Sequence, residues 1–149
     1  MPIQARQKLL NNIVQKIVVG SLVYGLLGLG VAFAEDCKKQ AKLLRGDYDV
    51  VQADGGLWRF MEKSSRLRDD SMLGLQIDGI LQRGVTHIEN ACKEGKPASP
   101  QLIRELEALI SEARTLNNKS TSRTPAKKLK EMIQALLKSS QEWAEKNSI

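Results

Sequence analysis

The chain contains one long uncharged run of eighteen residues, Ile17–Ala34, whose role decides which residues are left to build the fold. Arg6, Lys8 and Lys16 precede the run, and no acidic residue occurs before Glu35. A basic segment followed by an apolar run is typical of a secretory signal peptide. The run therefore separates a leader from the part of the chain that must fold by itself.

The end of the run favours cleavage. Ala32 and Ala34 occupy the −3 and −1 positions of a cut before Glu35, where signal peptides carry small residues. We therefore predict a signal peptide over residues 1–34 and a single helical domain over residues 35–149. The protein would then be periplasmic or secreted.

A retained membrane anchor is the alternative. The run is slightly shorter than the ~20 residues that span a bilayer. However, small residues recur in it at intervals of four, a spacing that favours helix packing in lipid. Retention of residues 17–34 would make the protein a single-pass inner-membrane protein with its C-terminal domain outside the cytoplasm.

The charge balance does not indicate nucleic acid as a partner. The whole chain has a net charge of +6, and three of its bases but none of its acids lie in the leader, so +3 remains after residue 34. A small exported domain with that charge is an ordinary soluble protein.

The two cysteines, Cys37 and Cys92, both follow the leader. An even cysteine count in an exported chain predicts a disulfide, and only one pairing exists. The bond would close a loop of about 55 residues, which corresponds to about 4 kcal/mol in the chain-entropy account.

The first half of the domain predicts one short helix and one long, interrupted helix. Cys37, Ala41 and Leu44 recur at the helical period, and Gly46 is expected to end that helix. Residues 47–56 are expected to form an acidic loop or a single turn. The next helix is expected from Leu57 to Lys93, with a break near residues 69–71, where Asp70 or Ser71 would cap a new start. Its second half carries a clear apolar stripe, formed by Leu73, Ile77, Ile80, Leu81, Gly84, Ile88, Ala91 and Cys92.

Two later helices begin with the same device. Ser99-Pro100 and Thr124-Pro125 each place a hydroxyl residue at the N-cap and proline at the first helical position. A polar loop over residues 117–123 is expected between them. The stripes that follow are Leu102, Leu106, Leu109, Ile110, Ala113 and Leu116, and then Leu129, Met132, Ile133, Leu136, Leu137, Ser140, Trp143 and Ala144. With no clear strand period, the sequence predicts an all-α fold, a small antiparallel bundle of three to four helices.

No catalytic or cofactor motif is present after the leader, so we expect a protein that is not an enzyme and has no cofactor. A haem- or metal-binding bundle is a weaker alternative. It would have to use His87, the only histidine, on the flank of the apolar stripe, and no metal ligands are predicted.

Two surfaces are candidates for binding. The first is basic and free of acids, and it could contact an acidic protein or an anionic envelope surface. Its residues are Arg114, Lys119, Arg123, Lys127, Lys128 and Lys130. The second is a candidate protein-contact face at Trp58, Arg59 and Phe60. We expect a non-catalytic protein that binds another protein, as an adaptor, inhibitor, chaperone or accessory subunit. The alternative is a membrane-anchored accessory subunit of an inner-membrane complex.

Overall fold

A computed structural model of the chain describes residues 35–96, 98–119 and 123–149. The predicted signal peptide or anchor, residues 1–34, lies outside the described residues. Residues 37–149 form one compact unit. None of the helices in the described ranges is long and apolar enough to cross a membrane.

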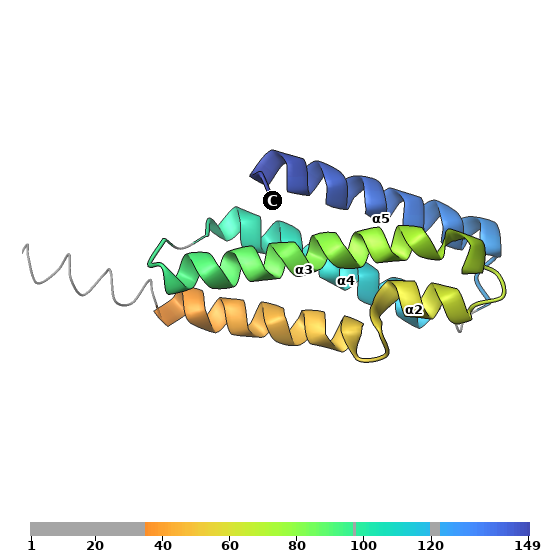
Figure 1. The fold of residues 1–149 in the computed structure, drawn as a ribbon, viewed down its shortest axis with the longest axis horizontal. Helices are drawn as coiled ribbons and strands as arrows, with labels where there is room; N and C mark the ends of the chain where they lie inside the picture. The colour runs from red at the N-terminus through yellow and green to blue at the C-terminus, as the bar shows by residue number, and fades with distance from the viewer. Residues whose placement is uncertain (1–34, 97, 120–122) are drawn as a thin grey trace, which may run out of the picture. The chain divides into compact units, whose positions relative to one another are not determined.

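The described residues are helical and contain no strand, which confirms the predicted fold class. The helices are a first one over residues 35–52, α2 at Gly56–Lys63, α3 at Ser71–Lys93, α4 at Pro100–Lys119 and α5 at Ala126–Asn147, with the 3-10 turn η1 at Arg68–Asp70 between α2 and α3. The 35–52 helix and α2 run in one direction, α3 returns, and α4 and α5 repeat this alternation (Figure 1). The helical unit is therefore an antiparallel bundle.

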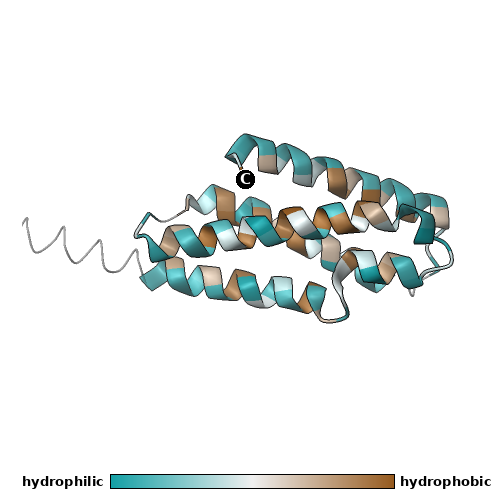
Figure 2. Cartoon of the chain, in the orientation of Figure 1, coloured by the Kyte–Doolittle hydropathy of each residue, from teal (hydrophilic) through white to brown (hydrophobic). Residues whose placement is uncertain are grey.

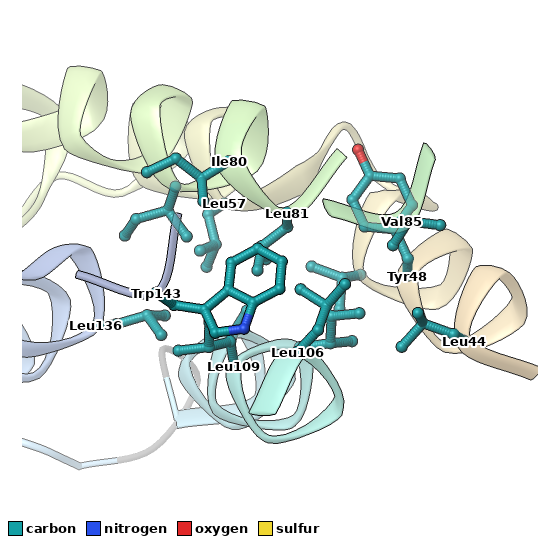
Figure 3. Packing of buried hydrophobic residues seen from close by; sticks show 14 of the residues in the cluster. Leu44, Tyr48, Leu57, Ile80, Leu81, Val85, Leu106, Leu109, Leu136 and Trp143 are labelled. Carbon is teal, nitrogen blue, oxygen red and sulfur yellow. The ribbon is translucent and has the colours of Figure 1, made fainter. Parts of the chain in front are cut away.

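The apolar stripes meet inside the bundle, where most of their residues are buried. Hydropathy along the ribbon shows the same division, with apolar positions gathered on the surfaces between helices (Figure 2). Trp143 of α5 lies at the centre, among leucines from α3, α4 and α5 (Figure 3). Gly84 makes room for this indole, because a Cβ at residue 84 would lie 2.6 Å from the ring atom Cη2 of Trp143.

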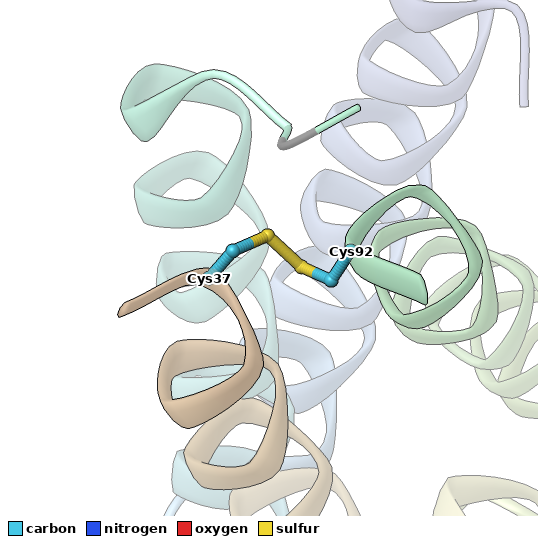
Figure 4. The surroundings of a disulfide bond; sticks show 2 residues. All are labelled: Cys37 and Cys92. Atoms are coloured by element: carbon cyan, nitrogen blue, oxygen red, sulfur yellow. A yellow bond between two sulfur atoms is a disulfide. The ribbon is translucent and has the colours of Figure 1, made fainter. Parts of the chain in front are cut away.

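The predicted disulfide is present. Cys37 of the 35–52 helix is bonded to Cys92 near the end of α3, with the two Cα atoms 5.7 Å apart (Figure 4). Both cysteines are buried. Two turns further along, Arg45 donates hydrogen bonds of 2.8 and 2.6 Å to the two carboxylate oxygens of Glu89. The 35–52 helix is thus joined to α3 by a covalent bond and an adjacent bidentate ion pair.

The prediction that Gly46 ends the first helix is wrong. The helix continues through Gly46 to residue 52, and residues 47–52 are not a loop. Tyr48 and Val51 are buried and extend the stripe of Ala41 and Leu44 by two turns. Burial of these side chains outweighs the ~1 kcal/mol by which glycine disfavours a helix.

The predicted interruption of the long helix is present, but it is longer than expected. The first part, α2, ends at Lys63, and α3 begins at Ser71 after η1. Asp70 occupies the N-cap position without a capping hydrogen bond from its side chain. Its carboxylate instead forms an ion pair of 3.0 Å with Lys130 of α5.

The two hydroxyl–proline pairs behave differently. Ser99 caps α4 as predicted, since its Oγ accepts a hydrogen bond of 3.1 Å from the backbone N–H of Leu102. Helix α5 begins one residue later than expected, with Pro125 at the N-cap and no capping side chain. The predicted loop over residues 117–123 is also too long, because α4 continues to Lys119.

Candidate functional site

A groove of 890 Å³ lies at the end of the bundle where α2 and the last turns of α4 meet. The end of the 35–52 helix forms one wall, α2 and the segment after it form a second, and the end of α4 forms a third. The lining residues are Val50, Val51, Asp54, Gly56, Phe60, Lys63, Ser64, Ser65, Arg66, Arg114, Asn117 and Asn118. Segments that lie up to 68 positions apart in the chain, from residue 50 to residue 118, are therefore brought to one site.

Helix α2 is positioned by a carboxylate from another helix. Asp78 of α3 is buried, and it accepts hydrogen bonds of 3.1 Å from the backbone N–H of Leu57 and 3.0 Å from that of Trp58. These are N–H groups in the first turn of α2, where no intrahelical acceptor exists. Asp78 therefore supplies the cap that Gly55, the residue at the N-cap position of α2, cannot provide.

The same carboxylate also fixes the end of the first helix. The side chain of Gln52 donates a hydrogen bond of 3.1 Å to Oδ1 of Asp78. Burial raises the pKa of Asp78 above its ordinary value, although the bonds from Trp58, Leu57 and Gln52 act in the opposite direction. Asp78 thus connects the 35–52 helix and α2, which both line the groove, to α3.

Three glycines allow α2 to lie this close. Gly55 and Gly56 have φ angles of 94° and 75°, in the left-handed region that side-chain-bearing residues disfavour. A Cβ at Gly56 would lie 2.6 Å from Oδ2 of Asp78. In α3, a Cβ at Gly74 would lie 2.8 Å from the backbone nitrogen of Trp58. The turn between the first helix and α2 therefore requires glycine at positions 55 and 56. Close packing of α2 on α3 requires glycine at position 74.

Further hydrogen bonds connect the elements around the groove. The side-chain amide of Asn117 in α4 donates a long hydrogen bond of 3.5 Å to the carbonyl oxygen of Val51. Arg66 donates one of 2.8 Å to the carbonyl oxygen of Thr124, just before α5. The side chain of Arg68 donates one of 3.2 Å to the carbonyl oxygen of Glu62. Hydrogen bonds from side chains to backbone carbonyls thus hold the elements together at this end of the bundle.

The lining combines positive charge with apolar surface. Lys63, Arg66 and Arg114 are basic, whereas Asp54 is the single acidic residue among the lining residues. Phe60 packs partly against the core, and Val50 is 51% exposed. The groove therefore presents cationic groups beside apolar side chains that are partly exposed to solvent.

The residues of the basic candidate surface lie on α4, on α5 and on the segment between them. Arg114 lines the groove. Lys127 and Lys128 are exposed at the start of α5, and Arg123 is exposed just before it, whereas Lys130 is paired with Asp70. The side chain of Lys119 lies outside what the structure describes.

The second candidate surface, Trp58, Arg59 and Phe60, lies on α2. Phe60 lines the groove, but Trp58 does not. The guanidinium of Arg59 lies 5.7 Å from the centre of the Trp58 ring and also forms an ion pair of 3.1 Å with Glu62. The structure thus brings Phe60 from one predicted surface and Arg114 from the other into the same groove, and leaves Trp58 and Arg59 outside its lining.

His87 is exposed on α3. Within the described ranges, no group of three or more histidine, cysteine or acidic side chains is arranged to hold a metal ion.

Sequence reasoning missed Asp78 and the contribution of Val50, Lys63 and Arg66 to the groove. One signal for Asp78 was available. Gly74, Asp78 and Val85 recur at the helical period together with Leu81 of the recognised stripe, and all four are buried. A carboxylate within a second apolar stripe indicates a buried acid that must have hydrogen-bond donors nearby.

Comparison with known proteins gives no match: no family model fits the sequence, and neither a curated protein nor a solved structure is similar to it.

Proposed function

We propose that this protein is an exported, non-catalytic binding protein that holds an acidic segment of another protein in the groove beside α2. The observation that carries the proposal is the lining itself, which gathers three bases and one acid around the exposed Val50 and the partly buried Phe60. Adaptors, inhibitors, chaperones and accessory subunits all work by such binding.

Charge complementarity determines the class of partner. Arg114 and Lys63 stand on different walls of the groove, α4 and α2, so a bound segment would have basic groups on both sides. Asp or Glu side chains of the partner would pair with these groups, and an apolar residue between them would cover Phe60 and Val50. Such an arrangement favours the encounter and fixes the register of the bound segment.

The exported location rests on the leader-like sequence of residues 1–34, and the disulfide is compatible with an oxidising compartment. N-terminal sequencing of the protein purified from its cells tests it. A mature chain that begins at Glu35 supports export with cleavage, whereas an intact N-terminus contradicts cleavage and favours the anchored form.

Site-specific photo-crosslinking in the producing cells tests the binding proposal. A photoreactive residue replaces Val50, which lines the groove, and in a matched control it replaces Leu43. Leu43 is an exposed apolar residue of the same helix, 60% accessible, and it is not in the lining. We expect a specific cross-link at residue 50 only, to a protein segment that mass spectrometry identifies as acidic.

Charge reversal completes the test. The cross-link at residue 50 should be lost with Arg114→Glu or Lys63→Glu and kept with Lys128→Glu, which changes an exposed base outside the lining. The proposal is overturned if there is no cross-link, if residues 50 and 43 cross-link alike, or if the captured molecule is a lipid, a nucleic acid or a segment without excess acid.

A further inference from the structure

Helix α3 carries three glycines at intervals of five residues, Gly74, Gly79 and Gly84. Packing inside the bundle explains two of them. A Cβ at Gly74 would meet the backbone of α2, and a Cβ at Gly84 would meet the indole of Trp143. Each of these positions excludes a larger residue because another part of the same chain approaches within 3 Å of the place a Cβ would occupy.

Gly79 has no such neighbour among the described residues. The only atom near its virtual Cβ is a guanidinium nitrogen of Arg83, at 3.7 Å, an ordinary contact with a flexible side chain. Glycine in the middle of a helix costs about 1 kcal/mol relative to alanine. Packing within a single chain therefore does not explain the glycine at position 79. Close packing of another molecule against this face of α3 would explain it.

The surroundings of Gly79 suit such an approach. It lies in a second groove, of 640 Å³, between α3 and the end of α5, where Leu75, Ile80, Ala144 and Ile149 supply apolar surface. Leu75, one turn before Gly79, is 45% exposed, and Met72, a further turn away, is 58% exposed. The two grooves share no lining residue.

The charges of this second groove indicate what would occupy it. Arg83 stands on the α3 wall and Glu145 on the α5 wall, and neither forms an ion pair within the described part of the chain. A surface that carries one unpaired base and one unpaired acid is complementary to itself. A twofold axis can bring Arg83 of each copy to Glu145 of the other.

We propose that the occupant is a second copy of this chain, with α3 of the two copies crossing at Gly79. The absence of a side chain at the crossing lets the two helix axes approach closely, which brings Leu75 and Met72 of each copy onto the apolar surface of the other. The proposal adds an oligomeric state to the binding protein described above and leaves the groove beside α2 open in both copies.

Sedimentation velocity over a series of protein concentrations tests the proposal. The protein is expressed as the full chain and purified in the form in which the cells accumulate it. The variants are Gly79→Leu, Arg83→Glu, Glu145→Arg and the double variant Arg83→Glu/Glu145→Arg. Gly46→Leu is the matched control, because Gly46 is an exposed helical glycine that has nothing within 4 Å of its virtual Cβ and lines neither groove. Circular dichroism establishes that each variant is folded.

We expect a reversible dimer that Gly79→Leu weakens by about tenfold or more, because the new side chain would hold the two helices apart. Each single charge reversal should weaken the dimer to a similar extent, because like charges would then face each other. The double variant should restore the dimer, and Gly46→Leu should leave it unchanged. A protein that stays monomeric throughout the series overturns the proposal. So does a dimer that tolerates Gly79→Leu, or one that the double charge reversal does not restore.

Discussion

The two ends of the bundle hold their helices together by different means. At one end, the disulfide Cys37–Cys92 and the Arg45–Glu89 ion pair join the 35–52 helix to α3 directly. At the other, α2 is held by hydrogen bonds from its backbone to the carboxylate of Asp78 and by close packing on Gly74. At the first end, bonds between side chains join the two helices. At the second end, the backbone of α2 is held by its hydrogen bonds to Asp78 and by its close contact with Gly74.

This difference bears on where binding is proposed. The groove beside α2 is built at the end without a covalent constraint, so its shape depends on the Asp78 network. The disulfide should matter most for overall stability, and Asp78 for the local geometry of the groove. The predictions that follow separate these two contributions, from the largest expected effect to the smallest.

The disulfide gives the largest effect. Cys37→Ala/Cys92→Ala should lower the free energy of unfolding by about 4 kcal/mol, because the unfolded chain regains the entropy that a cross-link over 55 residues removes. Urea unfolding of the variant and the oxidised protein measures this.

Hydrogen exchange then gives the location of the effect. Amides in the first turns of the 35–52 helix should exchange faster in the disulfide variant. Amides of α2 should show no additional loss of protection beyond that caused by the lower stability of the whole domain. A variant that loses protection first in α2 would contradict the separation between the two ends.

Asp78→Ala should have a smaller global effect and a larger local one. We expect a loss of about 2 kcal/mol in the free energy of unfolding, because the backbone N–H groups of Leu57 and Trp58 lose their acceptor in a buried place. The cross-link from residue 50 should also be lost, since α2 carries Phe60 and Lys63 into the groove.

Asp69→Ala provides the control for Asp78→Ala. Asp69 is an exposed acid of η1, and its replacement should change the free energy of unfolding by less than about 0.5 kcal/mol. Equal effects of the two substitutions, or a cross-link that survives Asp78→Ala, would show that Asp78 does not position α2.

The elements that could be predicted are those determined by local periodicity. The stripe from Leu102 to Leu116 predicted the buried face of α4, and the placement of both cysteines after the apolar run predicted their bond. The boundary at Gly46 was wrong because local propensity was weighed without the burial of Tyr48 and Val51, which only the packed neighbours supply.

The groove could be predicted only in parts. Arg114 and Phe60 were each identified as surface candidates, but nothing near either residue in the sequence indicates that they line one groove. Their proximity depends on Asp78, whose hydrogen-bond partners lie 20 to 26 positions away in the chain. The helical period can indicate that Asp78 is buried, but it does not indicate which partners it has, because pairings over such separations follow from the tertiary arrangement.

The smallest expected effect is a difference in pH dependence between two carboxylates, Glu89 at one end of the bundle and Asp78 at the other. The hydrogen bond from Arg45 lowers the pKa of Glu89 below its ordinary 4.5. A lowered pKa in the folded state means stability that is present above the unfolded value and is lost as the pH falls through the folded one. Glu89→Gln should therefore cost up to about 1 kcal/mol at neutral pH, and the difference from the unsubstituted protein should vanish on acidification.

Asp78 should respond in the opposite direction. Burial raises its pKa above the ordinary 3.8, so the folded chain takes up a proton before the unfolded chain does. The resulting contribution is complete below the unfolded pKa and is lost as the pH rises through the folded pKa. The difference between the unsubstituted protein and Asp78→Ala should therefore widen on acidification, while the difference for Glu89→Gln narrows. Urea unfolding at a series of pH values measures both, and two curves with the same slope would mean that the carboxylates at the two ends lie in equivalent environments.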